Sequence, residues 1–398
     1  MYERTAIVVG GGIGGLAAAI ALRRVGWRVH VFEQAPEFTE VGAGILVWPN
    51  GLRALHEIGL AGAVRALGTI GYSGGIQSAS GRWLVRTSIE ALERAYGPCV
   101  LLTRSALLRV LLGALPRYAL HTDVEVQGVR VHRNKAIVEY DGGSESADIV
   151  IGADGLHSVV RASTGLHASR TTRSEPWTAK PHYVGYTAWR MITEVLPFEL
   201  NQGAEVWGKG ERFGYAALPG GAHGAGPGKT GGKHAYCYAT ARVLEGGTER
   251  DIAMLRERFA GWPDPIPALL ASTTQDAVLR HDLYRLPSMP SFVRGRVALL
   301  GDAAHAMPPD LGQGACQALE DAAVLGNCLA SGDPVIGLAN YDKARRHRAQ
   351  WVANHSTMLG VIGQTAAPPL VWLRDIAVGR MSERSMIRQL RKVLNWQP

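Results

Sequence analysis

Three glycines near the start of the chain have the spacing of a dinucleotide-binding turn. In Gly10-x-Gly12-x-x-Gly15 the first glycine permits a tight turn, and the second lets the backbone reach a pyrophosphate. The third lets a helix pack closely on a strand. Glu33 stands 21 residues after Gly12, where a carboxylate can accept hydrogen bonds from ribose hydroxyls. We predict a bound dinucleotide that contacts Gly10, Gly12, Ile13, Gly14, Gly15 and Glu33.

The elements needed to position this turn are also present in the sequence. Residues 5–9 are typical of a buried parallel strand, residues 16–25 of an alanine-rich helix and residues 28–33 of a second strand. The helix would direct its free N–H groups and positive dipole end at the phosphates. We therefore expect an open α/β sheet that binds its ligand at the carboxyl ends of the strands.

Two later segments repeat the pattern of an apolar strand that ends in a carboxylate. The stretch 148–161 runs into Asp154-Gly155, and the stretch 297–305 runs into Gly301-Asp302. Both carboxylates follow a buried strand, where ligands of such sheets are bound. A ligand that contacts residues 10–15, 33, 154 and 302 must be large, or the sites must be several. These residues alone leave both NAD and FAD open.

Three motifs identify a family that this chain resembles. They are GGGIGG at 10–15, GADGLHSVVR at 152–161 and GDAAHAMPPDLGQGACQALEDA at 301–322. In this order and spacing they resemble the single-component flavoprotein monooxygenases of the para-hydroxybenzoate hydroxylase type. The stretches 41–60, 277–287 and 293–322 are most similar to urate hydroxylases and zeaxanthin epoxidases of that family. The resemblance implies FAD as the cofactor and NAD(P)H as a transient co-substrate.

The resemblance also assigns roles to particular residues. It implies that Asp302 contacts the ribityl chain of FAD and that Arg104 reaches its phosphates. Asp154 belongs to the segment that the family uses with NAD(P)H and is expected at the cofactor. Backbone N–H groups at the start of the late helix are expected at the pyrimidine edge of the flavin ring, where they stabilise negative charge. These backbone groups belong to Gly312, Gln313, Gly314 and Ala315, and the further FAD neighbours are Gln34, Gly44 and Val124.

On the substrate side, the resemblance points to Arg212 and Tyr236 as the catalytic pair, because they align with residues that urate hydroxylases place beside their substrate. The chain departs from those enzymes at Ala188, where they have an asparagine that bonds urate, and Arg190 is also unusual. Urate itself is therefore not the expected substrate. Two or three aromatic residues are expected to touch substrate, from the candidates Trp48, Trp189, Trp207, Phe213 and Tyr236.

The reaction implied by the resemblance follows from the cofactor. NAD(P)H reduces FAD, O2 forms a flavin C4a-hydroperoxide, and one oxygen atom passes to an aromatic or heteroaromatic ring. Two alternatives stay open at this point. One is epoxidation of an alkene in a terpenoid or other lipophilic substrate, and the other is a FAD-dependent reductase without oxygen transfer.

The fold class follows from the same patterns. We expect an α/β protein with a Rossmann-like FAD-binding domain, an inserted mainly antiparallel β-sheet substrate domain and C-terminal helices. The FAD-binding domain is expected to be discontinuous, over residues 1–72, 98–175 and 285–345. The substrate domain is expected over 73–97 and 176–284, and a C-terminal helical segment over 346–398.

Bulk properties narrow the partners. The 398 residues are 46% hydrophobic and 19% charged, as in folded proteins. The formal net charge of +8 suits nucleic acid, an anionic membrane or anionic ligands, but no nucleic-acid motif and no basic patch interleaved with aromatics accompanies it. We expect a small-molecule substrate and O2, no nucleic acid, no membrane contact, and a monomer or homodimer.

Cysteine and histidine usage bears on location and metals. Cys99, Cys237, Cys316 and Cys328 are far apart and form no C-x-x-C pair, which is typical of a reducing cytoplasm. His305 has no second histidine or cysteine nearby to complete a metal site. We expect a cytoplasmic protein without a metal ion.

Two other segments resemble functional motifs, a phosphate-binding loop and a membrane-binding helix. For each of them we also consider a purely structural interpretation. Residues 220–233 contain Gly228-Lys229-Thr230, the ending of a phosphate-binding loop, but His223 replaces its first glycine. A flexible hairpin is expected there. In the tail, a basic amphipathic helix would suit either an anionic membrane or packing on its own domain, and we expect the packing. Its apolar face consists of Met386, Ile387, Leu390, Val393 and Leu394.

Overall fold

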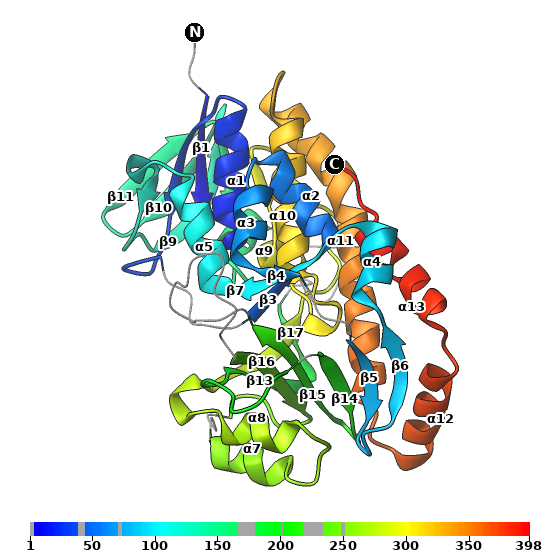
Figure 1. The fold of residues 1–398 in the computed structure, drawn as a ribbon. Helices are drawn as coiled ribbons and strands as arrows, with labels where there is room; N and C mark the ends of the chain where they lie inside the picture. The colour runs from blue at the N-terminus through cyan, green and yellow to red at the C-terminus, as the bar shows by residue number, and fades with distance from the viewer. Residues whose placement is uncertain are drawn as a thin grey trace, which may run out of the picture.

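The computed structural model describes residues 4–38, 44–70, 74–165, 180–200, 202–218, 234–247 and 251–398 (Figure 1). The stretch 220–233, in which the sequence predicts a hairpin rather than a phosphate-binding loop, lies outside the described residues. Within them, no helix is long and apolar enough to cross a bilayer.

A six-stranded sheet forms the first layer of the fold. Its order is β18-β19-β12-β1-β2-β8, and β1, β2, β8, β12 and β19 pair in parallel. The central strands are rich in Val, Ile and Ala and almost fully buried, as expected for a sheet covered on both faces. The bounds are β1 (Thr5–Val9), β2 (Arg28–Phe32), β8 (Leu120–His121), β12 (Ile149–Gly152), β18 (Val293–Arg294) and β19 (Val297–Leu299).

Helices from distant parts of the chain cover this sheet. The alanine-rich α1 and the later α10 pack against one another, because small side chains let the two helices approach. Figure 1 shows both beside β1, with α2 and α11 next to α10. The bounds are α1 (Ile13–Arg24), α2 (Pro49–Glu57), α3 (Ala61–Leu67), α5 (Arg104–Gly113), η1 (Arg117–Ala119), α6 (Val159–Thr164), α9 (Asp302–His305), η3 (Pro309–Leu311), α10 (Gly314–Cys328) and α11 (Pro334–Gly363).

A seven-stranded sheet forms the second layer, in the lower half of Figure 1. Its order is β17-β13-β16-β15-β14-β5-β6, and every pairing is antiparallel except that of β14 with β5. The bounds are β5 (Gly74–Ser78), β6 (Trp83–Thr87), β13 (His182–Ile192), β14 (Ala204–Trp207), β15 (Glu211–Leu218), β16 (His234–Ala241) and β17 (Leu279–Arg285). One face of this sheet packs on the helices α7 (Ile252–Arg258) and α8 (Ile266–Ala271), followed by η2 (Gln275–Ala277).

Two small antiparallel sheets complete the strand content of the described residues. One joins β9 (Val126–His132), β10 (Lys135–Tyr140) and β11 (Gly143–Ala147). The other joins β3 (Gly44–Val47), β7 (Val100–Thr103) and β4 (Thr69–Ile70). The strand β7 leads directly into α5, so the second small sheet fixes where that helix begins.

The 30-residue helix α11 runs alongside both layers and leads into the C-terminal segment (Figure 1). That segment contains α12 (Pro368–Gly379), α13 (Glu383–Gln389) and α14 (Arg391–Leu394), and α4 (Ile89–Tyr96) contacts α13. The tail is two short helices rather than the single helix expected from its apolar stripe, because the chain turns at Leu390.

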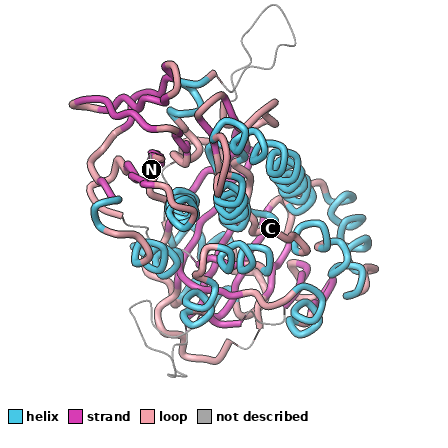
Figure 2. Tube along the Cα trace, turned by 90° about the horizontal axis from the view of Figure 1, so that it is seen from above, coloured by secondary structure: helices cyan, strands magenta, loops and turns pink. Residues whose placement is uncertain are grey.

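The tail packs on the body of the protein, as predicted. Val393 and Leu394 are 3% and 1% exposed, and Arg53 donates a hydrogen bond to the carbonyl oxygen of Trp396 at 2.7 Å. Arg348 donates to the carbonyl oxygen of Val393 at 2.8 Å. Seen from above, the C-terminus lies among the helices (Figure 2). The end of the apolar face, at Val393 and Leu394, is therefore covered by the protein's own chain.

These findings confirm the expected fold class, a mixed α/β protein with a parallel sheet, a mainly antiparallel sheet and C-terminal helices. The strands β5 and β6, from residues 74–87, belong to the same sheet as β13–β17. The domain boundaries drawn from the sequence stay a prediction.

Candidate functional site

A cavity of about 1820 Å³ lies between the six-stranded and the seven-stranded sheet. At one end Gly12 and Gly14 line it, and at the other end Trp207 and Arg374 do. Typical small-molecule pockets enclose about 300–1,000 Å³. The cavity therefore has room for a large cofactor together with a second molecule.

The glycine turn has the geometry that its sequence predicts. Gly10 has φ +104°, and a Cβ at Gly15 would lie 1.9 Å from the carbonyl oxygen of Gly10. A Cβ at Gly12 would meet no protein atom within 4 Å, so the backbone there borders open space. Gly12, Ile13 and Gly14 line the cavity at the start of α1, whose N–H groups face a ligand bound there. The turn thus fits a pyrophosphate.

Glu33 supports the turn from behind. One carboxylate oxygen accepts a hydrogen bond from the N–H of Gly11 at 2.7 Å, and the other accepts from the N–H of Ala35 at 2.9 Å. The neighbouring Gln34 is exposed, and Val124 donates its N–H to the carbonyl oxygen of Glu33 at 3.0 Å. The structure thus brings the predicted neighbours Glu33 and Val124 together behind the glycine turn.

The side chains of the two later carboxylates, Asp154 and Asp302, point in different directions. Asp302, the first residue of α9, is exposed to the cavity. Asp154 instead accepts hydrogen bonds from Ser158 Oγ at 2.6 Å and from the N–H of Val160 at 3.0 Å, so it fixes the start of α6. Burial raises the pKa of Asp154. In this segment Ala153, Gly155 and Leu156 line the cavity, and the cofactor contact of Asp154 stays a prediction.

The start of α10 lies at the middle of the cavity. Gly312 has φ +60°, and a Cβ there would approach Trp48 Nε1 to 3.0 Å. A Cβ at Gly314 would meet no protein atom within 4 Å. The segment Gly312 to Ala315 and Arg104 all line the cavity, and their contacts with FAD stay a prediction. The 15-residue α10 directs its positive dipole end and free N–H groups here, which suits the negative charge of a reduced flavin.

A buried polar network, which the sequence analysis missed, holds this helix start. Asn50 donates to Gln313 Oε1 at 2.8 Å and to Glu320 Oε1 at 2.7 Å. Arg345, fully buried on α11, forms ion pairs with Glu320 at 2.5 Å and with Asp321 at 2.7 Å. A buried charge is costly unless paired, so these pairs fix how α2, α10 and α11 sit together. In the sequence, the Gln-x-x-Glu-Asp run at 317–321 indicates this buried network only if the partner arginine is already known.

His305 belongs to the same network. Its Nε2 lies 2.6 Å from Asp321 Oδ2, and its ring packs against Phe292. Burial opposes ionisation of Asp321, but the neighbouring His305 and Arg345 outweigh it and lower the pKa of Asp321 to about 2. His305 is thus packed beneath the cavity.

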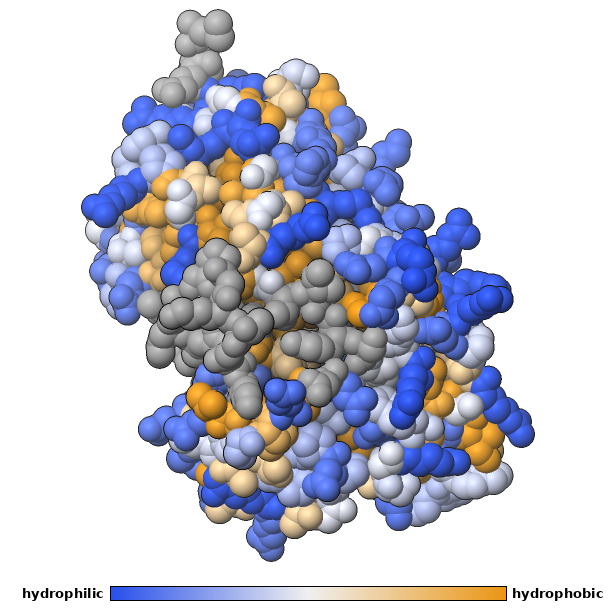
Figure 3. Space-filling model, viewed as in Figure 1, coloured by the Kyte–Doolittle hydropathy of each residue, from blue (hydrophilic) through white to orange (hydrophobic). Residues whose placement is uncertain are grey.

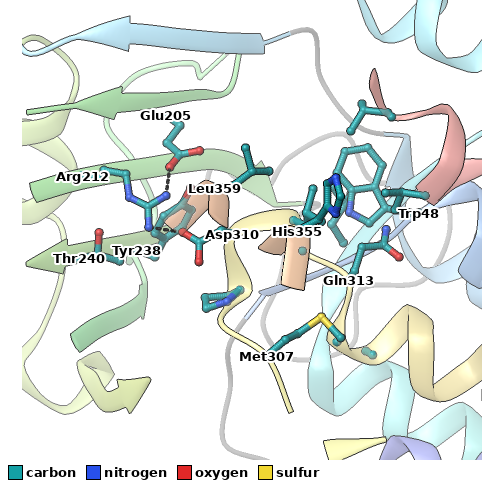
Figure 4. A pocket seen from close by; sticks show the side chains of 18 of the residues that line it. Trp48, Glu205, Arg212, Tyr238, Thr240, Met307, Asp310, Gln313, His355 and Leu359 are labelled. Carbon is teal, nitrogen blue, oxygen red and sulfur yellow. Dashed lines mark hydrogen bonds and ion pairs between the residues drawn. The ribbon is translucent and has the colours of Figure 1, made fainter. Parts of the chain in front are cut away.

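Arg212 lies at the opposite wall, on β15, within a cluster of charges (Figure 4). Its Nη1 donates to Glu205 Oε1 at 3.0 Å, and its Nη2 donates to Asp310 Oδ1. Tyr186 donates to the other oxygen of Asp310 at 2.5 Å. Burial lowers the pKa of Arg212, but the two carboxylates outweigh this and raise it. Arg212 therefore anchors Asp310, in the loop before α10, to the antiparallel sheet.

Tyr236 lies on the cavity face of β16, four residues from Thr240, which is paired with Arg212. Four residues of a strand span roughly 13 Å, so the two predicted residues share a face without touching. A Cβ at Gly44 would lie 2.5 Å from the ring of Tyr236, so this glycine makes room for the tyrosine. Burial raises the pKa of Tyr236. Tyr236 thus lies at the side of the cavity formed by β3.

The other substrate-side candidates divide between two faces of the sheet. Trp48 and Trp207, like Tyr236, line the cavity. Trp189 and Phe213 point to the opposite face and are buried in the core with α7 and α8, because side chains alternate along a strand. Ala188 and Arg190 both line the cavity. Tyr238, Asp310 and His355 also line it and were not singled out from the sequence. Asp310 lies within the motif at 301–322, and Tyr238 and His355 belong to no local motif.

Comparisons with known proteins agree with this geometry. The sequence profile of the family described as FAD binding domain matches residues 3–190 and 285–356. An aurachin C monooxygenase/isomerase of Stigmatella aurantiaca is 35% identical over 400 residues, which cover 99% of this chain and 98% of that protein. A FAD-dependent urate hydroxylase of Klebsiella pneumoniae is 31% identical over 363 residues, 87% of this chain and 86% of that protein.

A solved structure agrees along nearly the whole chain. The crystal structure of Klebsiella pneumoniae HpxO complexed with FAD and uric acid has a TM-score of 0.86 and 27% identity, covering 98% of this chain and 97% of that one. A cavity with a dinucleotide turn at one end and a helix N-terminus at its middle defines a flavoprotein of this kind. The chain belongs to the family of FAD-dependent aromatic hydroxylases and monooxygenases. It is an enzyme whose cofactor is FAD.

Proposed function

We propose that this enzyme uses NAD(P)H and O2 to hydroxylate an aromatic or heteroaromatic small molecule. One observation carries the proposal: the cavity that begins at the glycine turn continues to a sheet face lined by Tyr236, Tyr238 and Trp207. Flat aromatic side chains suit a flat ring as ligand. Relatives named 3-amino-4-hydroxybenzoate 2-monooxygenase and 6-hydroxynicotinate 3-monooxygenase, 34% and 31% identical, support a ring as substrate.

Residues of this chain would hold FAD at the parallel-sheet wall. Gly10 to Gly15, supported by Glu33, would take the pyrophosphate, with Arg104 beside it. Asp302 would contact the ribityl chain, and the start of α10 would face the flavin ring. When bound, FAD supplies the oxidation and oxygen-transfer chemistry. The N–H groups of α10 would stabilise negative charge on the ring without a proton to lose.

The antiparallel-sheet wall would hold the substrate. Tyr236 would contact the ring, and its hydroxyl is protonated at neutral pH, since burial raises its pKa further above the ordinary value. A protonated hydroxyl can donate to an oxygen of the substrate on which charge develops. Arg212 would act as a positioning residue, because both its terminal nitrogens are bonded to Glu205 and Asp310. It would keep the loop before α10 in place while substrate binds.

NAD(P)H would bind transiently, near the segment that contains Asp154 and Gly155. In the sequence, no second G-x-G-x-x-G follows a strand, which supports a transient rather than a dedicated site. The cytoplasmic location, and a monomer or homodimer as the working unit, also belong to this proposal and follow from the sequence alone.

Oxygen-isotope labelling tests the proposal. The holoenzyme is given NADH or NADPH under 18O2 with aromatic acids, hydroxylated heterocycles and, for the epoxidation alternative, terpenoid alkenes. We expect one labelled oxygen atom in a ring product for each NAD(P)H consumed. A labelled epoxide with no ring product would favour the epoxidase, and hydrogen peroxide alone with every compound would favour the reductase.

A variant locates the substrate wall in the same assay. Tyr236→Phe keeps the ring and removes the hydroxyl, so it is expected to retain FAD and to slow substrate-stimulated NAD(P)H oxidation about tenfold or more. Trp372→Phe on the surface of α12 is a matched control that should not change the rate. Unchanged coupled turnover in Tyr236→Phe would remove this residue from the site.

A further inference from the structure

Beyond the charged cluster around Arg212, the cavity continues into an arm whose walls are mostly apolar. We define the apolar arm as the part of the cavity lined by β5, β6, Trp207, the end of α11 and α12. Its apolar lining is made of Ile76, Val85, Trp207, Met358, Leu359, Ile362, Leu370, Leu373, Ala377, Val378, Met381 and Met386. In Figure 4 Leu359 lies between the Arg212 cluster and the Trp48 end of the cavity. The arm is thus continuous with the site that takes the ring.

The helix α12 presents one of its faces to this arm. Five of its residues line the cavity, at positions 370, 373, 374, 377 and 378, which is the i, i+3, i+4, i+7, i+8 spacing of a single helical face. In a surface helix such a face is normally buried against the protein. Here Leu370 is 55% exposed and Leu373 is 53% exposed. Leu370, Leu373 and Ala377 are therefore turned toward cavity space, whereas Val378 at the end of this face packs in a buried cluster with Trp207.

The charged residue on this face, Arg374, is paired with other groups and does not extend into the arm as a free cation. Arg374 donates hydrogen bonds to the carbonyl oxygens of Gly208 at 3.1 Å and Gly363 at 3.2 Å. It also forms an ion pair with Asp375 at 2.8 Å and lies 5.2 Å from the ring centroid of Trp207. Arg374 therefore ties α12 to α11 and to the sheet, and its aliphatic stem adds to the apolar wall.

Apolar side chains also mark the outer end of the arm. Met358 and Ile362 on α11 line the cavity and are 49% and 38% exposed. Val361 and Trp372, on the same two helices but outside the lining, are 67% and 63% exposed. Figure 3 shows hydrophobic surface at the lower right, where Figure 1 draws α12. Apolar surface left in water is unfavourable, and a contiguous patch of it at a cavity marks a ligand site.

We propose that the substrate of this enzyme carries an aliphatic chain on its ring and that this chain lies in the apolar arm along α12. The inference rests on the proposed function, since it places the reacting ring at Tyr236 and Tyr238. A methylene chain fits the arm because it has no polar group to satisfy, and the flexible Met358, Met381 and Met386 can adapt to its path. A small polar ring such as a purine would leave this lining unused.

Binding of 4-n-alkylphenols to the holoenzyme tests this inference, with chains from ethyl to decyl. The dissociation constant is measured from the change in flavin absorbance, which does not require turnover. Each added methylene is expected to tighten binding about three- to fourfold, because burying one CH2 contributes about 0.8 kcal/mol. The gain should continue along the series until the chain fills the arm.

Paired variants distinguish the arm from unspecific apolar binding. Met358→Gln and Leu373→Gln change lining residues, and Val361→Gln and Trp372→Gln are matched controls on the same helices. All four positions are partly exposed and glutamine is a good helix former, so the fold should tolerate each change. We expect the two lining variants to lose about three- to tenfold in affinity for decylphenol and little for ethylphenol. The two controls should bind both as the wild type does.

Other outcomes separate the inference from the function on which it rests. If short phenols perturb the flavin but chain length has no effect, the apolar-chain inference is overturned and the hydroxylase stands. An equal loss in all four variants would assign the chain to the outer surface of α11 and α12 and would also overturn it. If no phenol of any length binds or is turned over, both the inference and the proposed ring substrate fail.

Discussion

The two walls of the cavity bind their ligands by different means. The parallel-sheet wall presents mainly backbone: Gly12 and Gly314 border open space, and the N-termini of α1 and α10 supply N–H groups. The antiparallel-sheet wall presents side chains such as Tyr236, Tyr238 and Trp207. Backbone N–H groups suit a cofactor, because the phosphates and the ring of the cofactor are the same whichever substrate is bound. Side chains can be exchanged without moving the sheet, so we propose that the second wall sets the choice of substrate.

Breaking the charged cluster of the antiparallel wall should have the largest effect on stability. Arg212→Met leaves Asp310, whose side chain is fully buried, without its cation. Loss of one partner of a buried pair costs about 3–5 kcal/mol of unfolding free energy. Urea unfolding of the holoenzyme measures this loss. Flavin released from the folded variant then reports how much the loop before α10, which Arg212 anchors through Asp310, contributes to FAD retention.

The double variant Arg212→Met/Asp310→Asn is the control for charge. Removing the uncompensated carboxylate should recover part of the lost stability, since the penalty comes from an unpaired buried charge. If the double variant is no more stable than Arg212→Met alone, the packing of Arg212 rather than its charge holds this wall.

Glycine substitutions should separate the fold of the parallel wall from its ligand contact. Gly15→Ala forces a Cβ to within 1.9 Å of the carbonyl oxygen of Gly10, so we expect about 1–3 kcal/mol lower stability of the apoprotein and poor FAD binding. Gly12→Ala places its Cβ in open space, so the apoprotein should unfold as the wild type does. Its FAD dissociation constant should still rise about tenfold or more, because the methyl group occupies the path of the pyrophosphate.

Flavin fluorescence titration and thermal unfolding of the two apoproteins provide the comparison. Wild-type FAD affinity in Gly12→Ala would mean that the pyrophosphate does not approach this glycine. Equal destabilisation of both apoproteins would mean that the turn, and not the ligand, requires every glycine.

The geometry of the glycine turn could be predicted from the sequence and that of the charged cluster around Arg212 could not, for a physical reason. Gly10, Gly12 and Gly15 act through positions a few residues apart, so their spacing alone carries the geometry. Arg212 and Asp310 are 98 residues apart, and Asn50 and Gln313 are 263 apart. Such pairs form only after the sheets and helices have assembled. No local sequence pattern predicts these pairs.

The directions in which side chains point show the same limit in each of the two sheets. Trp207 and Phe213 are both aromatic residues of the second sheet, yet only Trp207 lines the cavity, because strand register decides the face. Asp154 and Asp302 both follow buried strands, yet Asp154 bonds to the start of α6 and Asp302 faces the cavity. Sequence identified these residues, and only the assembled fold separated their roles.

Acid is expected to have a smaller effect on stability, through the buried polar network beneath α10 that contains Asp321. The pKa of Asp321 is lowered to about 2, while an aspartate in an unfolded chain titrates near 3.9. As pH falls, the unfolded chain therefore takes up the proton first. The stability from this carboxylate, about 2–3 kcal/mol, is complete above pH ~5 and is lost as pH falls toward and below about 2. Asp321→Asn should remove this part of the pH dependence.

Unfolding free energies measured between pH 5 and pH 2 check this expectation. The wild type should lose stability more steeply than Asp321→Asn over that interval, whatever their difference at neutral pH. Parallel pH profiles for the two proteins would mean that the network does not depend on the charge of Asp321.

The central claim is that one cavity wall, from the glycine turn through Asp302 to the start of α10, holds FAD. The most direct test is the flavin content per chain of the purified wild type and of Asp302→Ala, read from the absorbance of released FAD. Asp302 is exposed to the cavity, so its loss should leave the fold intact. We predict one FAD per chain in a yellow wild-type protein and clearly weaker retention in Asp302→Ala. A colourless wild type that takes up no FAD, or full flavin content in Asp302→Ala, would contradict this assignment.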